Sequence, residues 1–167
     1  KPEVSDAIVR IVEQANEGVE NLHVTWFGGE PLLAAAEILR LSERLVTVCE
    51  QRGIEYAADI VTNGWLLTAE MATALRAVGV RTAQVTIDGP EHVHDAARPH
   101  KSGGGTFARV IRNVVDASQH IDVSVRVNIT RDNLAHVEQL LVELHERGLH
   151  DRVRVSFARV VDAPTAA

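Results

Sequence analysis

Residues 22–31 read LHVTWFGGEP, and this stretch decides the fold. Its first six residues are rich in β-branched and aromatic side chains, which favour a β-strand. Two glycines and a proline follow, so the chain can turn sharply into a helix predicted over residues 31–52. A strand that leads directly into a long helix is typical of α/β proteins, because parallel strands need a crossover that is usually helical.

The same alternation continues along the rest of the chain. Further strands are predicted over residues 56–62, 82–88, 122–130 and 152–158. Further helices are predicted over residues 4–18, 68–78, 107–119 and 133–147. We therefore expect an α/β fold in which about five parallel strands alternate with helices in a single domain over residues 1–167. The longest irregular stretch, residues 89–105, is predicted to be a binding or capping loop.

Composition excludes several classes of function. The formal net charge is −6 and no segment is dense in Lys and Arg, so a nucleic-acid partner is not expected. No apolar run is long enough to span a membrane, and the N-terminal residues lack the apolar core of a signal peptide, so a cytoplasmic protein is expected. With Cys49 as the one cysteine, neither an internal disulfide nor a cysteine-rich metal site can form. Cys49 lies among apolar residues of a predicted helix and is expected to be a core residue.

The end of the first strand carries Gly28, Gly29 and Glu30. In parallel α/β folds ligands bind at the carboxyl ends of strands, where glycines let a ligand approach the backbone. A carboxylate in this place can bind an ammonium group. The alternative is structural: the glycines form a tight turn, and Glu30 stabilises the start of the next helix through the helix dipole.

The second strand ends in Thr62, Asn63 and Gly64. Thr62 and Asn63 offer side-chain hydrogen bonds to a ligand, but an Asn-Gly pair after a strand is also ordinary turn chemistry. The two middle strands alternate polar and apolar residues, so each has one polar face. These polar side chains are Gln84, Thr86 and Asp88 on one strand and Ser124, Arg126, Asn128 and Thr130 on the next. Two neighbouring polar stripes favour a ligand site over a dry core, although a solvent-facing edge explains one of them.

Four motifs in this order resemble the radical S-adenosylmethionine (radical SAM) family. They are WFGGEPLL at 26–33, TNG at 62–64, QVTIDGPE at 84–91 with His94, Asp95 and Arg98 following, and RVNIT at 126–130. Their order is most similar to the branch that matures peptides and proteins, which includes the anaerobic sulfatase-maturing enzymes and the SPASM-type peptide modifiers. The resemblance covers residues 4–159. It implies a partial (β/α)6 barrel related to the TIM barrel, and a peptide or protein substrate.

The resemblance also implies roles for individual residues. In the family the Gly-Gly-Glu motif receives the amino group of SAM, which corresponds to Gly28, Gly29 and Glu30. Polar residues that end the middle strands hold the ribose and the methionine carboxylate; here they are Thr86, Asp88, Arg126 and Asn128, with Arg126 as the carboxylate partner. Asn63 is expected near the cofactor, and residues 157–159 near the adenine. For His94, Asp95 and Arg98, substrate contact and a salt bridge that closes the loop remain open alternatives.

One departure from the family is large. The family binds a [4Fe–4S] cluster through Cys-x3-Cys-x2-Cys, and this chain has no such motif. We expect the chain to begin just after the cluster loop of a longer parent protein, with the first strand upstream and an auxiliary domain downstream. The parent then cleaves SAM reductively to a 5′-deoxyadenosyl radical and takes its electron from an external donor. Without that first strand, residues 22–27 form an open edge, so self-association of the chain is expected.

Two other functions compete with this interpretation. A cluster-free barrel that serves as a binding or scaffold module would also account for the missing cysteines. An ordinary α/β enzyme with a phosphorylated ligand would carry a Gly-x-Gly-x-x-Gly or Walker A loop, and neither pattern is present.

Overall fold

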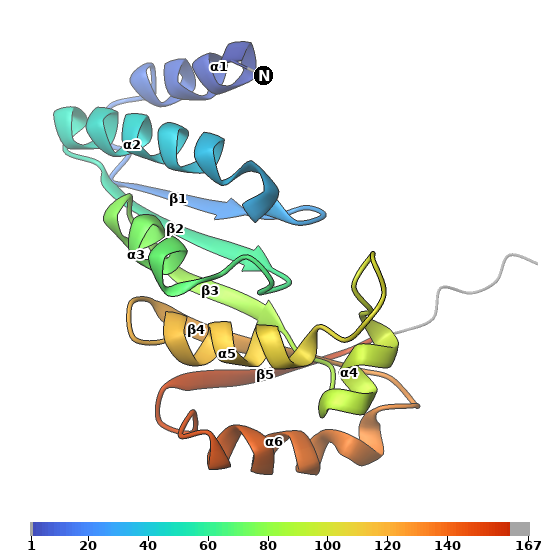
Figure 1. Cartoon of the computed structure of the whole chain (residues 1–167). Helices are drawn as coiled ribbons and strands as arrows, with labels where there is room; N and C mark the ends of the chain where they lie inside the picture. Colours follow the sequence, from blue (N-terminus) through green and yellow to red (C-terminus); the bar gives the residue numbers. More distant parts are fainter. Residues whose placement is uncertain (1, 161–167) are drawn as a thin grey trace, which may run out of the picture.

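The computed structural model describes residues 2–160 and forms one parallel five-stranded sheet, in the order β1-β2-β3-β4-β5. Every strand pairs with its neighbours in the sequence, as in an unrolled barrel (Figure 1). The strands are β1 (Asn21–Trp26), β2 (Glu55–Thr62), β3 (Val80–Thr86), β4 (Asp122–Ile129) and β5 (Val153–Arg159). The predicted α/β class with five parallel strands is therefore confirmed.

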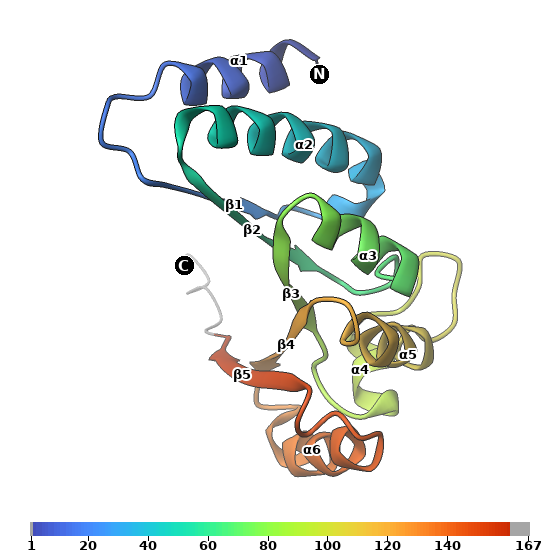
Figure 2. The ribbon, with the colours of Figure 1, turned by 90° about the vertical axis from the view of Figure 1, so that its left-hand side faces the viewer.

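Helices cover one face of this curved sheet, and α1 packs on the outer side of α2 (Figure 2). They are α1 (Pro2–Glu13), α2 (Ala35–Arg52), α3 (Ala69–Ala77), α4 (Glu91–Ala97), α5 (Phe107–Ala117) and α6 (Val137–Glu146). Two 3-10 turns, η1 (Pro31–Ala34) and η2 (Leu134–His136), precede α2 and α6. No helix among residues 2–160 is both long and apolar enough to cross a membrane.

The two faces of the sheet differ in chemistry. The helix-facing side chains, such as Ile60, Val85 and Val125, are completely buried and form the core. On the opposite face Thr86 lies beside Arg126 and Gln84 beside Ser124, as the alternating pattern predicts. No described helix covers this polar face (Figure 2). The fold therefore leaves a concave polar surface available to ligands.

The stretch 89–105, predicted to be irregular, contains the short helix α4. Seven residues are too few for a helix that is stable by itself, so sequence periodicity gave no signal. Tertiary contacts hold α4 in place, because His94 on its inner side is only 1% exposed. The prediction of a structureless loop was wrong for this part of the stretch.

The first helix ends earlier than predicted, at Glu13 instead of near Gly18. Arg52 at the end of α2 donates hydrogen bonds to the carbonyl oxygens of Glu13 and Ala15. Carbonyl groups at the end of a helix lack partners within the helix. The Arg52 guanidinium takes the place of the N–H groups that a further helical turn would supply. The polar residues that follow then continue as a turn into β1.

Candidate functional site

Glu30, at the carboxyl end of β1, is fixed by three hydrogen bonds. Its Oε1 accepts from the Thr62 hydroxyl at 2.7 Å and from the Leu32 N–H at 3.0 Å. Its Oε2 accepts from the Asn63 N–H at 2.8 Å. The Leu32 contact caps η1, as the structural alternative predicts, while the other two tie the end of β1 to the end of β2. A carboxylate accepts about four hydrogen bonds, so Oε2 retains acceptor capacity for a ligand.

The glycines before Glu30 leave the backbone open. Gly28 and Gly29 have φ angles of +108° and +46°, which side chains disfavour, and a Cβ built on either meets nothing within 4 Å. No Lys, Arg or His of residues 2–160 forms an ion pair with Glu30. This end of the site is therefore open and carries a carboxylate charge that no cation in the described chain neutralises.

The turn after β2 is held by its own side chains. Asn63 Oδ1 accepts from the Trp65 N–H at 2.8 Å, and the Thr62 hydroxyl accepts from the Gly64 N–H at 3.1 Å. Asn113 of α5 donates to the carbonyls of Gly64 and Trp65, at 2.8 and 3.0 Å. A Cβ on Gly64 would lie 2.7 Å from Val85 Cγ1, so a larger residue does not fit. Turn chemistry thus accounts for Asn63 Oδ1, while Asn63 itself is exposed and lines the same cleft as Glu30.

Asp88, just after β3, joins three segments. Its Oδ2 accepts from Arg98 Nε at 2.6 Å, and its Oδ1 accepts from the Asn128 N–H at 3.1 Å. Asn133 Nδ2 donates to the carbonyls of Asp88 and Asn128, at 2.8 and 2.7 Å. The ends of β3 and β4 are therefore locked together. Of the two alternatives for Arg98, the structure contains the ion pair that closes the loop.

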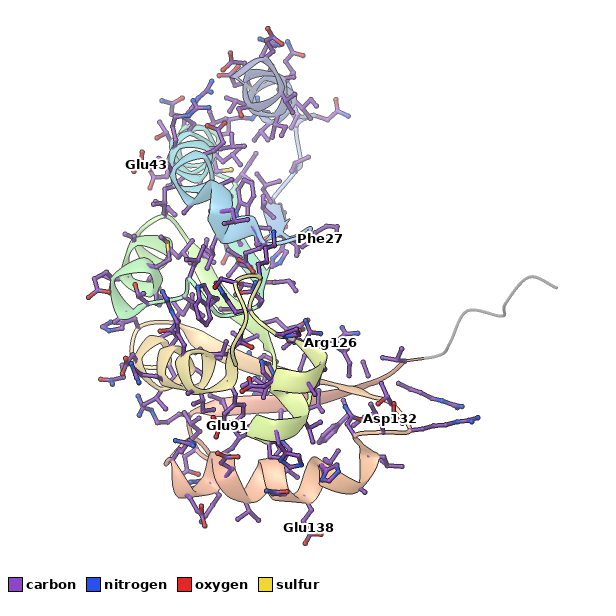
Figure 3. All side chains as sticks on the ribbon, turned by 45° about the vertical axis from the view of Figure 1, so that its right-hand side comes forward. Phe27, Glu43, Glu91, Arg126, Asp132 and Glu138 are labelled. Carbon is purple, nitrogen blue, oxygen red and sulfur yellow. The ribbon has the colours of Figure 1, made fainter. Side chains whose placement is uncertain are left out.

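Arg126 lies next to Thr86 on the polar face of the sheet. In Figure 3, Arg126 and Phe27 lie on the side of the sheet opposite to Glu43 of α2. Arg126 Nε donates to Asn128 Oδ1 at 3.1 Å, and its terminal nitrogens form no hydrogen bond within residues 2–160. A guanidinium held through Nε keeps its planar fork free for a carboxylate.

The loop between β3 and α5 is closed by Asp95. Its Oδ1 accepts from the N–H groups of Thr106 and Phe107, at 2.7 and 2.8 Å, and so caps the start of α5. A Cβ on Gly105 would lie 1.9 Å from Asp95 Oδ2, so this position requires glycine. Asp95 therefore acts within the loop.

His94 supports the same loop from inside. Its Nδ1 accepts a long hydrogen bond of 3.4 Å from the Asp88 N–H, and its ring packs edge-on against Phe107. Burial lowers the pKa of His94, and the nearby Arg98 charge lowers it further against the opposing effect of Asp88 and Asp95. The imidazole is therefore neutral at pH 7 and accepts the Asp88 N–H through its unprotonated nitrogen.

A cleft of about 740 Å³ opens beside Glu30; we call it the Trp65 cleft. Its lining includes the apolar side chains of Leu33, Trp65 and Leu66, which we call the Trp65 wall, and residues 97–101 of the loop after α4, which we call the loop wall. The Trp65 ring is stacked on His100 with centroids 4.5 Å apart, and the Arg109 guanidinium lies 4.3 Å from its centroid. Gly29, Glu30 and Asn63, which were predicted to bind the cofactor, also line the cleft.

No metal site is present among residues 2–160. They contain no group of three or more His, Cys, Asp or Glu side chains that could hold a metal ion. Cys49, a residue of α2, is fully buried, and desolvation raises the pKa of its thiol, which opposes the thiolate form that binds iron. The predicted core role of Cys49 is confirmed. A [4Fe–4S] cluster therefore does not fit the residues that the structure describes.

Sequence reasoning missed Asn113, Asn133 and Trp65. Asn113 is an amide on the buried face of α5, between Val110 and Val114, and a polar side chain at such a core position was the available signal. Asn133 looks like an ordinary turn residue, because its carbonyl partner at Asp88 is 45 positions away in the sequence. No pattern in the sequence around Trp65 indicated that this residue lines a cleft.

An open parallel sheet with polar side chains at the carboxyl ends of its strands is typical of barrel-type α/β proteins, a class that binds its ligands at that edge. The chain belongs to the radical SAM superfamily, whose family model matches residues 2–144. The family membership predicted from the four motifs is therefore confirmed.

Known relatives agree with this assignment. The serine-type anaerobic sulfatase-maturating enzyme of Klebsiella pneumoniae is 26% identical over 142 residues, which cover 84% of this chain and 36% of that protein. The AdoMet-dependent heme synthase of Oleidesulfovibrio alaskensis is 27% identical over 126 residues, which cover 73% of this chain and 29% of that protein. The chain thus spans about a third of the length of these relatives.

Solved structures show the same fold. Native anSMEcpe with bound AdoMet and the Kp18Cys peptide has a TM-score of 0.79 at 22% identity, covering 97% of this chain and 43% of that one. The radical S-adenosylmethionine methyltransferase TsrM from Kitasatospora setae has a TM-score of 0.63 at 18% identity, covering 95% of this chain and 28% of that one. At these identities the similarity demonstrates the fold alone.

Proposed function

We propose that this chain is the SAM-binding part of an enzyme that cleaves SAM reductively and uses the resulting 5′-deoxyadenosyl radical to modify a peptide or protein. In this reaction one electron enters the sulfonium, the C5′–S bond breaks, and methionine and the radical are formed. A [4Fe–4S] cluster supplies that electron in the family. The cluster ligands have to come from outside these 167 residues, because Cys49 is their one cysteine.

The observation that carries the proposal is the separation of charge along the site. The methionine end of SAM holds an ammonium and a carboxylate. Glu30 has no cationic partner in the described chain, and Arg126 has no anionic one. In the proposed complex Glu30 and the open carbonyls of Gly28 and Gly29 bind the ammonium, while Arg126 binds the carboxylate.

The remaining polar residues complete the proposed cofactor site. Thr86 and Asn128 hydrogen-bond the ribose and the methionine carboxylate, Asp88 accepts from the ribose hydroxyls, and Asn63 lies beside the ammonium end. Asp88 also holds the Asn128 backbone in place, because its Oδ1 accepts from the Asn128 N–H while its Oδ2 is paired with Arg98. The chain's own part in the reaction is to bind and orient SAM and to exclude water.

Further partners belong to the same proposal. We infer an external electron donor, a cytoplasmic location and an oxygen-poor environment, since the chemistry is reductive. We also infer self-association through β1, which pairs only with β2 among the described strands. α1 packs on α2 and does not cover that edge (Figure 2). Sedimentation at micromolar concentration should detect a dimer, and a monomer at all concentrations would contradict the inference.

The deciding experiment uses the protein that contains these residues, reconstituted anaerobically with iron and sulfide and supplied with SAM and dithionite. We expect methionine and 5′-deoxyadenosine in equal amounts, measured by chromatography and mass spectrometry. The Arg126→Ala variant should form much less product at limiting SAM, whereas Arg112→Ala, an exposed position on α5, should equal the unmodified protein.

A cluster-free scaffold is the second candidate, and the single buried Cys49 is the observation that favours it. It predicts that the reconstituted protein binds no iron and forms no 5′-deoxyadenosine, which would overturn the enzymatic proposal.

A further inference from the structure

We propose that the Trp65 cleft binds an acidic, apolar segment of the peptide substrate, with Arg98 receiving a carboxylate and the Trp65 wall receiving an aliphatic side chain. This inference rests on the proposed function, because it names the chemistry of the peptide that the enzyme modifies.

The apolar wall is rigid, with half-buried Trp65 and Leu66 and an exposed Leu33. Trp65 contacts both His100 and Arg109, so its ring does not have to be ordered when a ligand binds. Leu33 is 76% exposed although it is a large aliphatic residue. An exposed aliphatic side chain at the entrance of a concave cleft is typical of a surface that contacts an apolar group.

Arg98 supplies the charged part of the cleft. Its Nε is anchored to Asp88 at 2.6 Å, and the Asp88 side chain is only 10% exposed. The terminal nitrogens of Arg98 form no hydrogen bond with residues 2–160, and Arg98 lines the cleft. An anchored guanidinium with a free edge is preorganised for a carboxylate.

Two cations line the cleft. The protein has a formal net charge of −6, yet the loop wall carries Arg98 and Lys101. Glu30 is the acidic residue that lines the cleft, and its carboxylate is turned toward the donors of Leu32, Thr62 and Asn63. Arg98 is already paired with Asp88, so Lys101 is the lining cation that has no ion-pair partner among residues 2–160, and its charge favours an anionic ligand over a cationic one.

The position of the cleft suits a substrate. It shares Gly29, Glu30 and Asn63 with the proposed SAM site, so a bound peptide would lie next to the methionine end of the cofactor. Arg126, the proposed partner of the SAM carboxylate, does not line the cleft. The two guanidinium groups therefore belong to different binding surfaces, one for cofactor and one for peptide.

The test is a titration of the ¹⁵N-labelled chain with the acetylated, amidated tripeptide Leu-Asp-Leu, followed by NMR. The Trp65 indole resonance should shift and saturate. Trp26, whose indole nitrogen is buried in the core and does not line the cleft, is an internal control and should not shift. The matched peptide Leu-Asn-Leu, which has the same shape without the charge, should bind about tenfold more weakly.

Variants assign the carboxylate partner. Arg98→Gln should remove the preference for Leu-Asp-Leu, and Lys101→Gln, which breaks no hydrogen bond of the fold, should reduce it by about threefold. Arg112→Gln on the outer part of α5 is the matched control and should leave both affinities unchanged. If Arg98→Gln does not fold, the Lys101→Gln variant and the comparison of the two peptides still test whether the cleft prefers the acidic peptide.

Three results would overturn the inference: equal affinity for the two peptides, no movement of the Trp65 resonance, or an Arg98→Gln variant that loses affinity for SAM but not for the peptide. The titration contains neither SAM nor a cluster, so its failure leaves the proposed function intact. A cleft that prefers the acidic peptide in a protein that forms no 5′-deoxyadenosine would instead remove the proposed function and keep the binding site.

Discussion

The carboxyl edge of the sheet contains two carboxylates in contrasting surroundings. Glu30, between β1 and β2, is fixed by two backbone N–H groups and one hydroxyl, and no cation of the described chain pairs with it. Asp88, between β3 and β4, is paired with Arg98 and lies near Arg126, whose neighbour Asn128 binds the same carboxylate. One end of the site is therefore anionic, and the other carries excess positive charge.

This difference gives the site a direction. In the proposed complex this difference orients the amino acid group of SAM, with its ammonium at the β1–β2 end and its carboxylate at the β3–β4 end. Both ends are rigid before a ligand arrives, because hydrogen bonds from other strands hold Glu30 and Asp88. The cost of ordering these side chains is thus met during folding and not during binding.

Neither end offers a thiolate, so the largest expected effect is complete absence of the cluster in the 167-residue chain by itself. After anaerobic reconstitution we expect no stoichiometric [4Fe–4S] absorption and no SAM cleavage, because one buried thiol provides too few ligands. Iron analysis and visible spectroscopy test this, with Cys49→Ala as the control that should look the same. A stoichiometric cluster in this chain would contradict the prediction.

Replacing each charged group by a neutral one tests the proposed orientation of SAM in the site. Glu30→Gln and Arg126→Ala should each weaken SAM binding by about 1.5–3 kcal/mol, the range for a charge-assisted hydrogen bond. Calorimetry with decarboxylated SAM sharpens the test, since Arg126→Ala should not weaken that analogue whereas Glu30→Gln should.

The control for this pair is Arg112→Ala, which should bind both ligands like the unmodified chain. Unchanged SAM affinity in both folded variants would refute the orientation. If Arg126→Ala also weakens the binding of decarboxylated SAM, Arg126 supports the structure of the site and does not contact the SAM carboxylate.

The two ends should also differ in their contribution to stability. Asp88→Asn weakens the ion pair with Arg98, a pair that is partly exposed, and should lower the free energy of unfolding by about 1–2 kcal/mol. Thr62→Val removes the hydroxyl between Glu30 and Gly64 and should cost about 1 kcal/mol. Urea denaturation measures both, and Asp132→Asn at an exposed position is the control. If all three variants lose the same free energy of unfolding, the Asp88–Arg98 pair contributes no more to stability than an exposed carboxylate.

The smallest expected effect is a pH dependence confined to the β3–β4 end. The pKa of His94 is lowered from its ordinary value of 6.5, so the folded state binds its proton less readily than the unfolded state. The contribution of the neutral imidazole to the free energy of unfolding is fully present above pH 6.5, and it is lost as the pH falls toward the lowered pKa. His94→Gln should flatten this part of the stability curve, and His120→Gln, at an exposed histidine, should not. An unchanged slope in His94→Gln would mean that other groups cause it.

Sequence reasoning predicted the strands and most helices because their signals are local. Alternation in residues 82–88 and 122–130 placed Thr86 and Arg126 on one face, and strand pairing confirms this. It could not predict the partners of Glu30 or Asp88, because hydrogen bonds such as that from Asn128 to Asp88 join residues 40 positions apart. The short helix α4 was missed for the same reason, since its stability comes from contacts of His94 and Asp95 with distant segments. The ligand roles of the eight predicted residues remain predictions.

Capping of α5 by Asp95 has a consequence for the dynamics of the loop. The carboxylate that starts α5 belongs to α4, so the first turn of α5 loses its cap whenever α4 unwinds. The seven-residue α4 cannot persist alone, and the two segments should open and close as one cooperative unit. In native-state hydrogen exchange, the amides of Thr106 and Phe107 should therefore exchange at the same rate as those of His94 and Arg98.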